Sequence, residues 1–359
     1  MFSRTGNSRY RVLLIVATFL VAISEPVVTC AGAENSSPRS SSQGFDPVGK
    51  SYGDLLLEGK RAFTASEYER VIQLMNFALT LEITRQQAAE ATLNRGLAYA
   101  LEDDVDRAIK DFDTALRLNP RLAGAYHARG MALMKKNNLE DALKDLQEAI
   151  NLSPSWQFYE GVAQLFGAKH EWSEALKNIE RAIELDPKAP VPYASRAYVE
   201  LRYRQYDKVI ADAGRAISLD HNTTMAYIAR ANAFIRLKRY EDADKDLQSA
   251  ANTDIKRPAG KFNGIAWLRA TCVDEKMRNG KIAVEFGTKA CDLTKWKEAG
   301  YIDTLAAAYA ESGDFESAVK WQQHALQMLE EAPLPNMPEL RARLALYQQH
   351  QPYRDQMKP

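Results

Sequence analysis

The sequence contains few of the residues that usually carry chemistry. Its 359 residues include three cysteines and five histidines. No two histidines stand four residues apart, and none belongs to a metal-ligand motif. A glycine-rich phosphate loop, a dinucleotide-binding fingerprint and a serine nucleophile elbow are also missing. These absences argue against the common classes of enzyme, and the sequence predicts no metal, no cofactor and no small-molecule substrate.

An excess of positive charge is missing as well. The chain has 47 basic and 47 acidic residues, so its net charge is zero. Removing residues 1–33, which contain three arginines and one glutamate, leaves 44 basic and 46 acidic residues and a net charge of −2. Because nucleic-acid binding requires a concentrated positive face, the sequence predicts no nucleic-acid partner.

A long apolar run is missing too, although the N-terminus contains a short one. Residues 12–23 form an apolar segment of 12 residues behind Arg4, Arg9 and Arg11, whereas a spanning helix needs about 20. Ala31-Gly32-Ala33 provides a cleavage site, which predicts a signal peptide over residues 1–33 and an exported, periplasmic or extracellular protein. An uncleaved anchor is the alternative, and it would be the only membrane contact. The polar residues 34–51 predict a flexible linker.

What the chain does contain is a repeat with a period of 34 residues. Residues 91–120 return as residues 124–154, so that Gly96 corresponds to Gly130 and Pro120 to Pro154. One small residue recurs along the chain, at Ala78, Ala115, Ala149, Ala182, Ala216, Ala250, Ala290 and Ala325. A second small or β-branched residue stands seven positions before each of them, which places both on one stripe of one helix.

This pattern predicts helix pairs in an all-α array. Each repeat has a helix A and a helix B of about 13 residues, antiparallel because the turn between them is short. Prolines such as Pro120 end helix B. Over residues 52–332 the predicted repeats, numbered one to eight, are 52–85, 89–122, 123–155, 156–189, 190–223, 224–257, 264–297 and 299–332. In residues 333–359, Leu340, Leu344 and Tyr347 predict an amphipathic capping helix.

The pattern of Gly96, Tyr99, Ala108, Phe112, Ala115 and Pro120 resembles the tetratricopeptide repeat (TPR) signature, in an exported bacterial form. The resemblance implies a right-handed α-solenoid whose concave groove binds extended or helical segments of other proteins, without catalysis. Groove positions of that family fall here on Leu93, Asn94, Leu97, His127, Met131, Met134, Glu160, Gln164, Tyr198, Ile228, Asn232 and Ile235. The expected partner is therefore a protein or peptide.

Four repeats carry an arginine on helix A and an aspartate sixteen residues later on helix B. The pairs are Arg95 and Asp111, Arg129 and Asp145, Arg196 and Asp212, and Arg230 and Asp246. Repeats four and eight lack both partners together. This joint presence and absence predicts a structural ion pair, either within one repeat or between neighbouring repeats.

Two cysteines would remain after signal cleavage. Cys272 and Cys291 lie near opposite ends of one predicted helix of about 18 Å, too far apart for a disulfide. We therefore expect two reduced thiols. The favoured function is a non-catalytic scaffold that binds protein segments. The alternatives are a role in envelope structure or assembly, and an enzyme or accessory subunit whose chemistry lies in residues 264–297.

Overall fold

The structure is a computed structural model that describes residues 49–254, 258–330 and 337–355. These residues form α-helices and one 3-10 helix, with no strand among them. None of the described helices is long and apolar enough to cross a membrane. The helices are α2 (Tyr52–Thr64), α3 (Tyr68–Ala78), α4 (Arg85–Leu101), α5 (Val105–Leu118), α6 (Ala123–Lys135), α7 (Leu139–Leu152), α8 (Trp156–Ala168), α9 (Trp172–Leu185), α10 (Pro190–Arg202), α11 (Tyr206–Leu219), α12 (Thr224–Arg236), α13 (Tyr240–Asn252), α14 (Ala259–Thr271), η2 (Glu275–Met277), α15 (Gly280–Leu293), α16 (Ala299–Ser312), α17 (Phe315–Glu330) and α18 (Met337–Gln348).

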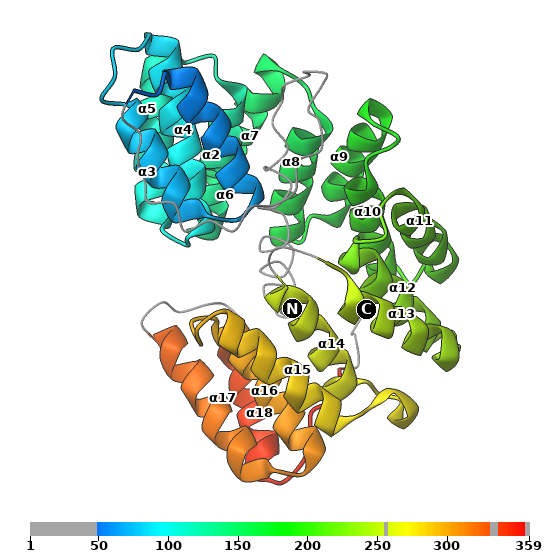
Figure 1. Cartoon of the computed structure of the whole chain (residues 1–359). Coiled ribbons are helices and arrows are strands. Elements are labelled where there is room, and N and C mark those ends of the chain that lie inside the picture. Colours follow the sequence, from blue (N-terminus) through cyan, green and yellow to red (C-terminus); the bar gives the residue numbers. More distant parts are fainter. Residues whose placement is uncertain (1–48, 255–257, 331–336, 356–359) are drawn as a thin grey trace. The chain divides into compact units, whose positions relative to one another are not determined.

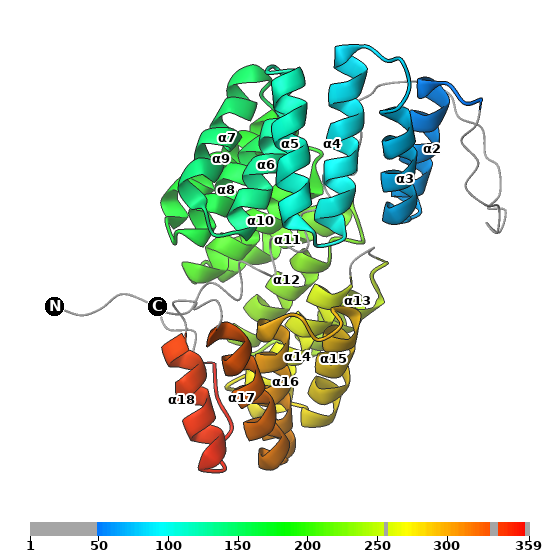
Figure 2. The same cartoon turned by 90° about the vertical axis from the view of Figure 1, so that its left-hand side faces the viewer.

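The described residues fall into two compact units. The N-terminal unit ends at Leu165 and the C-terminal unit begins at Phe166, so the boundary lies within α8. Within each unit, an A helix packs on the B helix that follows it, as α4 does on α5 and α14 on α15 (Figures 1 and 2). The fold is an all-α helical repeat solenoid, as the sequence predicts. No feature of the sequence predicts the boundary at Phe166. The predicted signal peptide and residues 34–48 of the linker lie outside the described residues.

Small residues allow the two helices of a pair to approach closely. A Cβ atom added to Gly96 of α4 would stand 2.7 Å from the ring of Phe112 on α5. One added to Gly130 of α6 would stand 2.9 Å from Leu146 on α7. Such distances are shorter than van der Waals contact, so a side chain at either glycine would push the two helices apart.

In seven of the eight repeats, the turn between helix A and helix B contains one residue with left-handed backbone; the longer turn of the seventh repeat has none. In the first six repeats it is the second residue after helix A, and its φ lies between 58° and 71°. These residues are Ser66, Asp103, Asn137, His170, Arg204 and Lys238. In the eighth repeat Gly313 takes this role, with φ of 87°. Because left-handed backbone strains any residue with a Cβ atom, the turn geometry is imposed by the packing of the two helices.

The helix α18 covers the end of the C-terminal unit and packs beside α17 (Figure 2). Leu340 and Tyr347 are fully buried and Leu344 is half-buried. The apolar pattern missed Arg343, which is only 3% exposed. Its guanidinium donates two hydrogen bonds, of 2.9 and 3.0 Å, to the carboxylate of Asp303 on α16, which is 1% exposed. Gln322 of α17 donates to the same carboxylate at 2.7 Å.

Candidate functional site

The C-terminal unit contains a pocket of about 260 Å³ where the turn after α12 meets the loop after α14. It takes side chains from α12, α13, α14 and the C-terminal tail. The lining residues are Asn232, Ile235, Arg236, Lys238, Tyr240, Leu268, Thr271, Cys272, Val273, Asp274 and Asp355. Two of them, Asn232 and Ile235, belong to the predicted groove. The lining combines apolar side chains with polar and charged ones, as ligand sites commonly do.

One wall of the pocket is held by a contact between two helix pairs. The phenol of Tyr240, the first residue of α13, donates a hydrogen bond to the carboxylate of Asp274. Asp274 also caps η2, since its other oxygen accepts from the backbone N–H of Lys276 at 3.0 Å. The bond from Tyr240 and the one from this N–H lower the pKa of Asp274, and the bond to Asp274 raises the pKa of Tyr240 to about 12. The loop is therefore fixed against α13.

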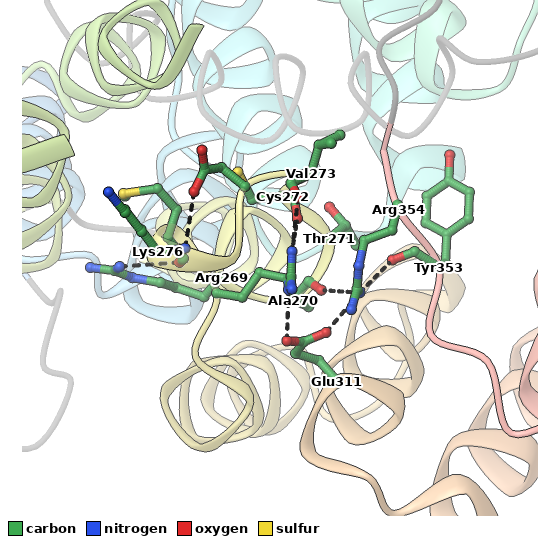
Figure 3. A network of polar contacts seen from close by, with 12 residues as sticks. Arg269, Ala270, Thr271, Cys272, Val273, Lys276, Glu311, Tyr353 and Arg354 are labelled. Carbon is green, nitrogen blue, oxygen red and sulfur yellow. Dashed lines mark hydrogen bonds and ion pairs between the residues drawn. The ribbon is translucent and has the colours of Figure 1, made fainter. Parts of the chain in front are cut away.

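The opposite wall is formed by the C-terminal tail. The backbone N–H of Asp355 donates to the carbonyl of Thr271 at 2.8 Å, and the carboxylate of Asp355 accepts from the indole N–H of Trp267 at 3.0 Å. Figure 3 shows Arg354 reaching Glu311 of α16, an ion pair of 2.7 Å. The tail is thus bound across α14 and α16 by specific polar contacts.

Glu311 also connects this tail to the loop beside the pocket. Its second oxygen accepts from Arg278 at 3.0 Å. Arg278 in turn donates to the backbone carbonyls of Cys272 and Val273, at 3.1 and 2.9 Å. The loop and the tail are therefore held by one network, which the sequence did not predict because its members are spread over three helices and a terminus.

Both described cysteines are buried, free thiols, as the helix geometry predicts. Burial raises the pKa of Cys272, and it raises that of Cys291 to about 12. A buried thiol with a raised pKa is almost entirely protonated at neutral pH, and the protonated form is a poor nucleophile. Within residues 49–254, 258–330 and 337–355, no group of three or more His, Cys, Asp or Glu side chains could hold a metal ion.

The structure brings the arginine and aspartate of all four predicted pairs together, within one repeat. Each aspartate accepts two hydrogen bonds from its arginine; in Arg129 and Asp145 both measure 2.7 Å. The other three pairs have the same two-pronged geometry, Arg95 with Asp111, Arg196 with Asp212 and Arg230 with Asp246. Bidentate pairs of this kind fix the angle between helix A and helix B as well as binding them.

Two of these arginines also contact the preceding repeat. Arg95 donates to the side chain of Asn76 at 2.7 Å, and Arg129 donates to Asp113 at 2.6 Å. Arg230 belongs to the sixth repeat, and the position that corresponds to Asp113 in the repeat before it is Gly214. A Cβ atom placed at Gly214 would stand 3.7 Å from Arg230. The second partner of the arginine therefore varies along the chain, whereas the first does not.

The predicted groove residues differ in how far they are exposed. Five are buried, namely His127, Met131, Met134, Glu160 and Gln164. Seven are half-buried, namely Leu93, Asn94, Leu97, Tyr198, Ile228, Asn232 and Ile235. His127 is only 7% exposed. It stacks on Phe158, with ring centroids 4.9 Å apart, and burial lowers its pKa to about 4.

The two asparagines in the predicted groove are engaged with their own helices. Asn94 donates to the backbone carbonyl of Glu90 at 3.0 Å, and Asn232 donates to that of Ile228 at 2.9 Å. Each of these bonds joins residues four positions apart. Of the two, only Asn232 lines the pocket.

Comparisons with known proteins agree with this architecture. Residues 89–122, 123–156 and 299–332 match sequence families described as "Tetratricopeptide repeat". No curated protein matches the chain by sequence. Yeast Tom70 is similar in structure, with a TM-score of 0.60 and 16% identity over 93% of this chain and 69% of that one. The Cut9–Hcn1 hetero-tetramer of APC/C contains a chain with a TM-score of 0.56 and 13% identity, over 81% of this chain and 55% of that one.

The chain is therefore a tetratricopeptide repeat protein. Three repeats are matched directly, and the remaining helix pairs have the same order of helix A, turn and helix B. The likeness to Tom70 and to the Cut9–Hcn1 complex is at the level of the fold.

Proposed function

We propose that the protein is a non-catalytic scaffold that binds a segment of another protein, and that the pocket beside α12 and α14 is its main contact. The main observation in support of this proposal is the pocket itself, whose lining includes the exposed side chain of Val273. Tetratricopeptide repeats are built for such a role because stacked helix pairs present an extended surface. A partner's side chain would occupy the pocket while its backbone follows the turns.

Three further features support binding over catalysis. The thiol in the pocket is protonated, the carboxylate of Asp274 is engaged by Tyr240, and the described residues contain no metal cluster. One chain of similar fold was solved within the Cut9–Hcn1 hetero-tetramer. That structure is an assembly of proteins, which is the kind of role proposed here.

Site-directed photo-crosslinking in the intact cell tests the proposal. A photoreactive amino acid replaces Val273 in one variant and Lys245, exposed on the B helix α13, in the control. We expect position 273 to yield a specific covalent adduct with another polypeptide, and position 245 to yield none. Equal adducts at both positions, or none at position 273, would contradict the pocket as the main contact.

We propose further that the protein acts after export, in the periplasm or outside the cell. The support is the charged flank, short apolar segment and small-residue cleavage site of residues 1–33. N-terminal sequencing of the protein from its native host decides between cleavage after Ala33 and an uncleaved anchor. A reporter enzyme that is active only outside the cytoplasm, fused after residue 359, would remain inactive if the protein is not exported.

A further inference from the structure

Six residues in the turns of repeats five, six and seven form a surface that the proposed function does not yet explain. We call them the basic turn edge: Tyr203, Arg204, Arg236, Leu237, Lys238 and Val273. Arg236 is the last residue of α12, and the other five follow the ends of the A helices α10, α12 and α14, which pack in succession in the C-terminal unit. Three of them line the pocket, so the edge and the pocket are continuous.

The cations of this edge have no ionic partner in the part of the chain that the structure describes. Among the described residues, Arg204, Arg236 and Lys238 form no ion pair, although the neighbouring Arg239 pairs with Asp242. Asp274 lies near enough to Lys238 for the positive charge of that lysine to help lower the pKa of Asp274. However, its oxygens already accept from Tyr240 and from the N–H of Lys276. The edge therefore retains positive charge that an incoming group can neutralise.

The apolar members of the edge are exposed to an unusual degree for large side chains. Tyr203 is 47% exposed, Leu237 is 40% exposed and Val273 is 52% exposed. The adjoining pocket of about 260 Å³ has room for a leucine or phenylalanine side chain, since a cavity of about 150 Å³ accommodates benzene. Alternation of cations with exposed apolar groups suits a partner that carries both anionic and apolar groups.

We propose that the basic turn edge binds an acidic polypeptide segment that seats one bulky apolar side chain in the pocket between α12 and α14. This inference rests on the proposed scaffold function and adds the chemistry of its partner. Aspartate and glutamate side chains of the segment would pair with Arg204, Arg236 and Lys238. The contact lies on the turns, and not on the inner faces of the A helices where five predicted groove residues are buried.

An acidic protein segment fits these observations better than a nucleic acid. The edge has three free cations, whereas nucleic-acid binding relies on an extended positive field. The chain as a whole has balanced charge. The pocket also carries the carboxylates of Asp274 and Asp355, so the side chain that enters it should be uncharged, whereas the acidic groups should lie on the edge outside it.

Fluorescence anisotropy with the full chain tests the proposal. The probe is a short fluorescein-labelled peptide of aspartate and glutamate around one leucine. The comparison probes replace its leucine with serine, replace its acids with lysine, or replace the peptide with labelled oligothymidine. We expect only the acidic leucine peptide to bind well, and its affinity to fall with added salt because exposed charges are screened.

Charge reversals assign this binding to the edge. Lys238→Glu, and separately Arg236→Glu, should weaken binding of the acidic leucine peptide by about tenfold each, because an attraction becomes a repulsion. Lys245→Glu makes the same charge change on the exposed B-helix face of α13 and should leave the affinity within about twofold. Val273→Ser should weaken the acidic leucine peptide more than the acidic serine peptide.

The remaining outcomes separate this inference from the proposed function. If the lysine peptide binds and Val273→Ser weakens it, the pocket is a protein site but the acidic chemistry is wrong. If Lys238→Glu and Lys245→Glu have equal effects, the edge is not the site. Oligothymidine binding that depends on Lys238, without peptide binding, would replace the proposal with a nucleic-acid site. If no probe binds, the acidic-segment inference is overturned, whereas the proposed function is decided separately by the photo-crosslinking at position 273.

Discussion

The two units use the same turn geometry to opposite electrostatic effect. Asp103 in the N-terminal unit and Arg204 in the C-terminal unit both have left-handed backbone, with φ of 71° and 58°. Asp103 pairs with Lys135, which lies 32 residues later. The residue 32 positions after Arg204 is Arg236, a second cation. The turn after α4 is neutralised within its own unit, whereas the turns after α10 and α12 retain unpaired cations among the described residues.

This difference shows which parts of a repeat can vary. In the N-terminal unit Arg107 pairs with Asp104 at 2.6 Å and Lys136 with Asp106 at 2.5 Å, so the turn charges are satisfied internally. The interior of both units, by contrast, has the same Arg–Asp pairs between helix A and helix B. Packing dictates the interior, and the turns are free to take the chemistry of a partner.

The largest expected effect is the loss of stability on removing a buried arginine, compared with the loss on removing an exposed arginine near a turn. Arg343→Met leaves the carboxylate of Asp303 buried without its cation, which should destabilise the C-terminal unit by about 3–5 kcal/mol. Arg107→Met removes an exposed pair of the N-terminal unit and should cost much less, because solvent screens a pair at the surface. Urea unfolding of both variants measures this contrast. Equal losses would mean that the capping helix contributes no more than a surface ion pair.

A change of pH should move the two units in opposite directions. Burial lowers the pKa of His127 to about 4, so the folded N-terminal unit holds fewer protons than its unfolded form and loses stability as pH falls below 6.5. Burial, reinforced by Asp212, raises the pKa of Glu200 to about 7. The folded C-terminal unit therefore holds more protons and gains stability as pH falls from 7 toward 4.5. Each effect amounts to about 2 kcal/mol between pH 7.5 and pH 5.

Hydrogen exchange of α6 and α11 at these two pH values, corrected for intrinsic rates, measures both slopes. Glu200→Gln should abolish the slope of α11 and leave that of α6 unchanged. Slopes of the same sign in both helices would contradict the opposite burial effects.

The next effect tests the arginine contact between repeats. Gly214→Asp would place a carboxylate where Arg129 has Asp113 and Arg230 has none. We expect it to stabilise the C-terminal unit by about 1 kcal/mol more than Gly214→Asn, which has the same shape without the charge. Thermal unfolding of the two variants measures the difference. If they are equally stable, the second partner of the arginine contributes nothing.

The smallest effect concerns the strained turns themselves. Lys238→Gly relieves left-handed backbone in a residue with no ion pair, so it should stabilise the protein by about 0.5 kcal/mol. Asp103→Gly relieves the same strain but loses the bond to Lys135, and aspartate tolerates this backbone better than lysine. We expect no gain there. Denaturant midpoints of the two variants measure this difference. Equal shifts in both variants would contradict it.

The sequence was sufficient for what repeats regularly. The recurring small residues predicted the helix pairs, because Gly96 and Gly130 have to meet Phe112 and Leu146 at short distance. The joint presence of arginine and aspartate predicted a contact, since a buried charge requires its partner. Regular spacing therefore translated directly into local structure.

Features that depend on distant segments could not be read in this way. Arg343 reads as a surface residue of an amphipathic helix until Asp303, 40 residues earlier, is placed opposite it. The pocket needs Asp355 of the tail and Asp274 of an irregular loop. His127 and Gln164 occupy positions that line a groove in the family, yet packing against neighbouring helices buries them here.

The contact between Arg129 and Asp113 limits how the repeats of this array can be reordered by engineering. Because each such arginine contacts the helix before its own, its repeat depends on a particular side chain in the preceding repeat. Moving the third repeat to another place in the array would separate Arg129 from Asp113. A join just before the sixth repeat would leave Arg230 as it is, because Gly214 offers it no side chain. Modules of this chain are thus interchangeable at some junctions and ordered at others.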